Sequence, residues 1–141
     1  MSKNIRFDLF IDNNHQWFVD LWVALSGRMA QIRFKVDTGC NALVLSHNTL
    51  KKLGFFTGIE NLAKLPAETG RLANGEISNF KNLGAILLFA DKNQSTQICR
   101  VPAICHATRK TNDLLGTAVF KQFCKVDFNL TNDKYMELRH S

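Results

Sequence analysis

The amino-acid sequence predicts a single, mostly-β domain with one or two short helices. Short apolar runs recur along the chain and are separated by turn-forming residues, which is the pattern of many short strands. Apolar residues make up 45% of the 141 residues and charged residues 21%, so the chain can bury a core without disulfides or metals. No repeat, low-complexity tract or linker divides it.

The first half of the chain is expected to begin with a strand at residues 5–11, followed by a turn. Residues 18–25 and 29–36 are predicted to form a hairpin across Ser26-Gly27-Arg28. Apolar residues at every second position of the first hairpin strand would share one face, namely Val19, Leu21, Val23 and Leu25.

A short strand and a short helix are expected next. Residues 41–45 read as a strand, and Ser46 is a suitable N-cap for a helix over residues 47–53 that ends at Gly54. A second hairpin is predicted from Gly70 to Ile77, with Asn74-Gly75 at its tip. The remaining elements are strands at residues 83–89, 96–104, 126–130 and 135–138, and a short helical segment at 117–123.

Charge and cysteine content exclude several classes of protein. The net charge is +6, but the basic residues are scattered, which favours a solvated surface over a nucleic-acid site. None of the four cysteines forms a CxxC pair, and the spacing of Cys99, Cys105 and His106 matches no common zinc pattern. We therefore expect free thiols, no metal and no cofactor.

The N-terminal residues contain no apolar core of a signal peptide, and the longest apolar run, residues 83–90, is too short to cross a bilayer. We expect a cytoplasmic protein with no membrane segment in this chain. An origin as an excised domain of a longer protein is equally compatible with these residues.

The tripeptide Asp37-Thr38-Gly39 is the candidate catalytic motif. It lies between two apolar segments, residues 32–36 and 42–45. An Asp-Thr-Gly turn is common on protein surfaces, but a carboxylate between two buried segments needs hydrogen-bond partners or a function. Glycine at the third position permits unusual backbone angles and close approach of other groups.

Other features stand around this motif in a recognisable order. The motif reads Phe34-Lys35-Val36-Asp37-Thr38-Gly39-Cys40, and an apolar pair with glycine, Leu114-Leu115-Gly116, precedes the short helix near the C-terminus. The tail from Phe120 to Phe128 ends in an apolar-Asp-aromatic strand. Over residues 18–138 this arrangement resembles the retropepsin-like aspartic proteases, and residues 1–17 would form an N-terminal strand or extension outside the protease domain of residues 18–141.

The resemblance implies a closed β-barrel, a homodimer and hydrolysis of extended polypeptides. Asp37 would carry the chemistry, Thr38 would hydrogen-bond across the dimer, and Gly39 would support the carboxylate through its backbone N–H. The Gly70–Ile77 hairpin would be the flap that closes over the substrate. Its substrate-binding residues would be Gly70, Arg71, Leu72, Ala73, Asn74, Gly75 and Ile77, while Leu114, Leu115 and Gly116 would pack under the active-site turn.

The mechanism of such enzymes needs two carboxyl groups that share a proton, one acting as general base and the other polarising the scissile carbonyl. No other Asp in the chain is followed by Thr or Ser and then Gly. One chain therefore supplies one carboxylate, and a two-fold dimer would place Asp37 beside its symmetry mate.

Some residues depart from the family pattern, and two alternatives stay open. Cys40 stands where Ala or Ser is usual, which suggests redox-sensitive activity, and the predicted flap tip has no aromatic residue. One alternative is a catalytically silent module of the same fold for dimerisation or peptide binding. The other is a small basic barrel that binds nucleic acid, although the eleven Phe residues stand mostly in core-like patterns.

Overall fold

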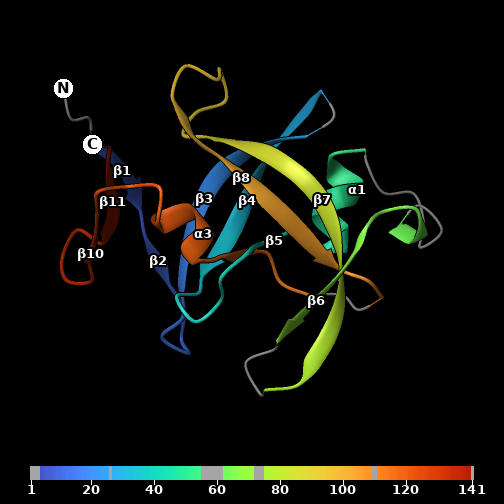
Figure 1. Ribbon diagram of the computed structural model, residues 1–141. Helices are drawn as coiled ribbons and strands as arrows, with labels where there is room; N and C mark the ends of the chain where they lie inside the picture. The colour runs from blue at the N-terminus through green and yellow to red at the C-terminus, as the bar shows by residue number, and fades with distance from the viewer. Residues whose placement is uncertain (1–3, 26, 55–61, 72–74, 109–110, 141) are drawn as a thin grey trace.

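The computed structural model describes residues 4–25, 27–54, 62–71, 75–108 and 111–140 (Figure 1). Strands dominate, and the helices are short, which confirms the mostly-β prediction. The elements are β1 (Asn4–Asp8), β2 (Phe10–Ile11), β3 (Trp17–Leu25), β4 (Arg28–Val36), β5 (Leu43–Val44), α1 (His47–Lys52), β6 (Ala67–Arg71), β7 (Ile77–Phe89), β8 (Gln97–His106), β9 (Leu114–Leu115), α3 (Thr117–Phe120), β10 (Lys125–Asn129) and β11 (Tyr135–Arg139).

Six of the described strands close into a barrel. The hydrogen-bonding order is β3, β4, β9, β5, β8 and β7, and β7 pairs back onto β3 through Trp22–Ala24 and Leu87–Phe89. The pairs β4–β9 and β5–β8 are parallel, and the other pairs in the ring are antiparallel. The closed barrel expected from the resemblance is thereby confirmed, with β2 and β6 extending it at β3 and β7.

The first long hairpin forms where the sequence predicts it. β3 and β4 pair from Phe18–Lys35 to Leu25–Arg28, and the alternating residues of β3 point into the barrel. Val19, Leu21 and Val23 are fully buried there, and Phe34 of β4 is fully buried opposite them. Burial of these side chains on both strands sets the register, because a slip by one residue would turn the apolar set outward.

A three-stranded sheet, ordered β1, β11, β10, packs beside the barrel. The single strand expected at residues 5–11 is divided at Leu9, whose backbone N–H donates to the carbonyl of Lys134 at 3.0 Å. β1 therefore pairs with the C-terminal hairpin while β2 pairs with β3. The alternation of apolar residues did not predict that the pairing strand changes at Leu9, because β1 and β2 continue the same apolar pattern.

The predicted capping of the first helix is confirmed. The Ser46 hydroxyl accepts a hydrogen bond from the Thr49 backbone N–H at 3.1 Å, and Ser46 has the extended backbone of an N-cap. Leu53 is the C-cap and Gly54 follows with φ of +68°. The helix thus ends at Lys52, one residue earlier than expected, and the predicted Gly54 directly follows its C-cap.

Strand β7 is longer than the expected strand at residues 83–89, since it begins at Ile77 and joins the hairpin to the barrel. The register of β7 against β8 shifts between Asn82 and Gly84. Gly84 adopts φ of +78°, and its N–H donates to the side-chain oxygen of Asn82 at 2.7 Å. This β-bulge bends β7 without ending the strand.

The cysteines are free thiols, and their environments differ. Cys99 and Cys105 are buried on β8, Cys40 is half-buried and Cys124 is exposed. Burial raises the pKa of Cys99 to about 12 and that of Cys105 to about 11. Among the described residues, no group of three His, Cys, Asp or Glu side chains could hold a metal ion, and no helix has the length and apolar character to span a membrane.

Thiol labelling should separate these cysteines. The thiolate is the reactive form, so at pH 8 a water-soluble disulfide reagent is expected to label Cys124 rapidly and Cys99 and Cys105 at least about a hundredfold more slowly. All four thiols should react at once in denaturant. A Cys124→Ser variant that keeps the rapid phase would contradict this assignment.

Candidate active site

The Asp37-Thr38-Gly39 turn follows β4 directly and leads towards β5. Val36 before the turn and Leu43 after it are buried, as the apolar flanking segments predict. The turn itself is at the surface of the single chain, because Asp37 is half-buried while Thr38 and Gly39 are exposed. The sequence therefore predicted correctly that the segments flanking the motif are buried. It did not predict that Thr38 and Gly39 are exposed.

Backbone hydrogen bonds hold the Asp37 carboxylate in place. The Asp37 N–H donates to the carbonyl of Leu115 at 3.0 Å, and the Cys40 N–H donates to the Asp37 carbonyl at 3.1 Å. The Gly39 N–H donates to Oδ1 of Asp37 at 3.1 Å. This last contact orients the side chain within the turn.

Strand β9 lies between β4, which precedes the Asp37 turn, and β5, which follows it. Leu114 and Leu115 pair in parallel with the end of β4, and the same two residues pair antiparallel with β5. Leu115 is fully buried. The structure thus brings the distant Leu114-Leu115 pair directly against the segments that enter and leave the Asp37 turn.

Gly116 lies where no larger residue fits. A Cβ atom at this position would be 2.2 Å from the carbonyl oxygen of Ala42 and 2.5 Å from that of Cys40. Immediately after it, the Thr117 N–H donates to the Cys40 carbonyl and the Ala118 N–H donates to the Asn41 carbonyl, both at 2.8 Å. The beginning of α3 is therefore joined to the last residues of the Asp37 turn by backbone contacts.

Asp113 is a supporting residue that sequence reasoning missed. Its carboxylate accepts hydrogen bonds from the Ser46 N–H at 2.7 Å, the Ser46 hydroxyl at 3.2 Å and the Thr49 hydroxyl at 2.9 Å. Its backbone carbonyl accepts from the Lys35 N–H at 2.9 Å. Asp113 thus joins α1 to the strands that carry Asp37. Its position directly before the Leu114-Leu115-Gly116 element was the available signal.

An Asp113→Asn variant should be less stable than the wild type. An amide can accept on only one of its two heteroatoms, so at least one hydroxyl or N–H donor of Ser46 or Thr49 loses its partner. The free energy of unfolding should fall by about 1–3 kcal/mol, measured by urea titration. The exposed Asp133→Asn is the matched control and should leave stability within about 0.5 kcal/mol of wild type. Equal stabilities for the two variants would argue against this role.

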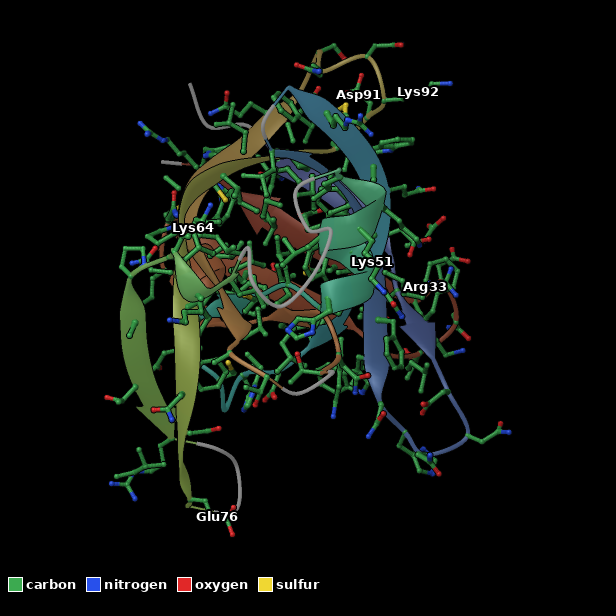
Figure 2. The ribbon with its side chains drawn as sticks, turned by 90° about the vertical axis from the view of Figure 1, so that its right-hand side faces the viewer. Arg33, Lys51, Lys64, Glu76, Asp91 and Lys92 are labelled. Carbon is green, nitrogen blue, oxygen red and sulfur yellow. The ribbon has the colours of Figure 1, made fainter. Side chains whose placement is uncertain are left out.

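The predicted flap begins as the paired strands β6 and β7, from Ala67–Lys81 to Arg71–Ile77. Figure 2 shows Glu76 at the far end of this hairpin, and Asp91 and Lys92 at the opposite end of the molecule. The Arg71 guanidinium donates to the carbonyl of Gly75 at 2.9 Å, and Ile77 is 69% exposed. Leu72, Ala73 and Asn74 of the predicted substrate-binding set lie outside the described residues.

Aromatic and polar contacts anchor the base of this hairpin. The Phe80 ring lies against Gly70, where a Cβ atom would be 2.9 Å from the ring, and it contacts the His106 ring edge-on with 5.2 Å between the centroids. The Thr108 N–H donates to Nδ1 of His106, and Nε2 of the same ring is hydrogen-bonded to the Ser78 hydroxyl at 2.6 Å. The hydrogen bond between Ser78 and His106 joins the start of β7 to the end of β8.

Cys40 has a less reactive environment than its place in the sequence suggests. Its thiol donates to the carbonyl of Ala42 at 3.5 Å. Burial raises the pKa of this thiol, and the nearby Asp37 carboxylate adds to the effect. Because oxidants attack the thiolate, these conditions slow oxidation of Cys40 at neutral pH.

The arrangement offers one oriented carboxylate at the surface of the chain. A carboxylate can act as a general base on water, but polarising the scissile carbonyl requires a second acidic group at the same site. Within the described residues, the side chains around Asp37 include no second carboxylate with an equivalent turn. Among the described residues, one chain thus presents one carboxylate in such a turn.

Comparison with known proteins supports the fold. No protein-family model and no curated relative matches the chain. Among solved structures, the chain is similar to a retropepsin-like aspartic protease from Rickettsia conorii, with a TM-score of 0.59 and 16% sequence identity over 99% of this chain and 93% of that one. The similarity covers nearly the whole of both chains, so this chain has a fold similar to that of the Rickettsia protein.

Proposed function

We propose that the protein is an aspartic endopeptidase that hydrolyses peptide bonds of extended polypeptides as a homodimer. The observation that carries the proposal is the Asp37 turn itself: the carboxylate accepts from the Gly39 N–H, and β9 lies directly beneath it. The fold shared with the Rickettsia enzyme adds support, since it is the fold of an aspartic protease.

In the proposed mechanism, two Asp37 carboxyl groups meet at the two-fold axis and share one proton. The ionised carboxylate takes a proton from a water molecule as that water attacks the scissile carbonyl carbon. The protonated partner donates a hydrogen bond to the carbonyl oxygen and stabilises the charge that develops there. The exposed Thr38 hydroxyls would hold the two turns together across the axis.

Substrate would bind as an extended strand between the Asp37 turns and the β6–β7 hairpin. The exposed Ile77 side chain, in the last described pair of this hairpin, suits contact with an extended peptide. Closure of the hairpin would exclude water from the reacting atoms.

A peptide-library cleavage assay tests this function. Wild type should cleave a subset of peptides, and pepstatin or a similar transition-state-mimicking peptide should block the cleavage. Peptide binding by wild type without cleavage at any pH between 3 and 8 would instead identify a catalytically silent binding module of the same fold.

A further inference from the structure

Strand β4 carries two cations on its outward face near Asp37, namely Arg33 and Lys35. They alternate with residues that are buried in the barrel, which are Ile32, Phe34 and Val36. The Arg33 guanidinium is neutralised within the chain, because it donates to both carboxylate oxygens of Asp20, at 2.8 and 3.0 Å. The Lys35 ammonium makes no ion pair with any residue that the structure describes. Of the two cations, Lys35 is therefore the one available to another molecule.

Lys35 lies on the same face of the strand as Asp37. Its backbone N–H donates to the carbonyl of Asp113, and the Asp37 N–H donates to the carbonyl of Leu115, so the parallel pairing with β9 continues regularly up to Asp37. Residues two apart on one strand point to the same side, and their Cα atoms lie about 6.6 Å apart. The Lys35 side chain therefore leaves the strand beside that of Asp37.

Apolar side chains flank Lys35 on both neighbouring strands. Phe18 of β3 and Leu114 of β9 are its direct pairing partners, and all three side chains are half-buried. Paired residues of adjacent strands point to the same side, so these residues form one row across the sheet with Lys35 in its centre. A carboxylate that binds there is partly shielded from water, which strengthens the ion pair compared with one on an open surface.

A polar cavity lies beside this row. Its volume is about 470 Å³, and its lining includes three neighbours of Lys35, namely Phe18, Arg33 and Asp113. The Asp113 carboxylate is already occupied by hydrogen bonds from α1 and its N-cap. Lys52, which also lines the cavity, makes no ion pair within the described ranges of the chain. The cavity thus offers room for a substrate side chain next to Lys35 and a second cation on the same side.

We infer that Lys35 is a specificity-determining residue, which selects an Asp or Glu side chain of the substrate near the scissile bond by pairing with its carboxylate. The inference rests on the proposed function and deepens it by naming the class of peptide preferred. Side chains on one face of an extended substrate also repeat every 6.6 Å or so, which places the selected residue about two positions from the scissile bond. In a two-fold dimer the second Lys35 lies on the other side of that bond, so acidic residues are favoured on both sides.

Matched peptides that differ only in Glu against Gln test this selection. Starting from a peptide that wild type cleaves, each position within about three residues of the scissile bond is changed to Glu and to Gln. At pH 6, kcat/KM at the selected position should be about tenfold higher for Glu than for Gln, the effect of one charge-assisted hydrogen bond. Lys35→Met keeps an unbranched stem without the charge and should reduce this ratio to less than about twofold. Lys92→Met, the same change at an exposed lysine between β7 and β8, is the control and should keep the wild-type ratio.

Two further measurements separate recognition from a structural role of Lys35. Lys35→Glu should reverse the selection, so that a peptide with Lys at the selected position is cleaved faster than the peptide with Glu. The preference of wild type for Glu over Gln should disappear as the pH falls from 6 to 3, because a peptide Glu titrates near about pH 4.3 and its neutral form cannot pair with the ammonium. A loss of folded protein would lower the cleavage of both peptides equally and leave their ratio unchanged.

Three results would overturn the inference. The first is that wild type shows no preference for Glu at any of the positions. The second is that Lys35→Met keeps the preference, and the third is that Lys92→Met loses it as well.

Retention of peptides distinguishes failure of this selection from failure of the proposed function. A mixed peptide library is passed over immobilised Asp37→Asn protein, with and without the additional change Lys35→Met. If wild type cleaves no peptide, the proposed function fails, and retention of acidic peptides that depends on Lys35 would keep the selection in a binding module. If wild type cleaves peptides through Asp37 without preferring Glu, the proposed function stands and the selection fails. The absence of both cleavage and retention would remove both.

Discussion

Asp37→Asn should reduce peptide cleavage by at least about a thousandfold, because the amide can neither take a proton from water nor share one with a partner carboxyl group. The fold should survive, since the amide oxygen can still accept from the Gly39 N–H. The kcat/KM for a peptide found in the library assay measures the loss. The exposed Asp133→Asn is the control and should retain wild-type activity.

Mixing the inactive variant with wild type extends this prediction to the dimer. With free exchange, a one-to-one mixture contains about a quarter wild-type homodimers, so activity per wild-type subunit should fall about twofold, and a ninefold excess of Asp37→Asn should lower it about tenfold. Asp133→Asn subunits should add activity instead. Activity that stays proportional to wild-type concentration would place the complete site in one chain and contradict the shared-site mechanism.

The sequence predicted the elements around Asp37 well because local patterns specify them. Alternating apolar residues determine β3 and β4, and a polar N-cap with a glycine stop determines α1, so both elements formed close to the expected bounds. The motifs Asp37-Thr38-Gly39 and Leu114-Leu115-Gly116 were recognisable because few residue types satisfy such tight turns.

The features that were missed depend on which segments meet in space. Leu9 divides the N-terminal strand because its N–H bonds to Lys134 at the other end of the chain. Asp113 connects β9 to α1 through side chains that are 64 and 67 positions away in sequence. No local pattern contains such contacts, and the exposure of Thr38 likewise depends on the packing around the turn.

Gly116→Ala should have the largest effect on stability of any small substitution at the site. The added methyl group would lie 2.2 Å from the Ala42 carbonyl oxygen and 2.5 Å from that of Cys40, and both are backbone atoms of the turn that carries Asp37. Side-chain rotation cannot relieve this overlap, so β9 or the turn must move. We expect the free energy of unfolding to fall by about 3 kcal/mol or more, measured by urea titration.

Gly39→Ala is the matched control for this prediction, since it adds the same methyl group to the same turn. There the nearest atom is Oδ1 of Asp37 at 3.4 Å, an ordinary contact, and the free energy of unfolding should change by less than about 1 kcal/mol. Equal losses in the two variants would mean that the turn tolerates no added methyl anywhere. A loss confined to Gly116→Ala would instead locate the constraint at the contact between β9 and the residues that follow Asp37. That contact holds the backbone of the turn that carries Asp37.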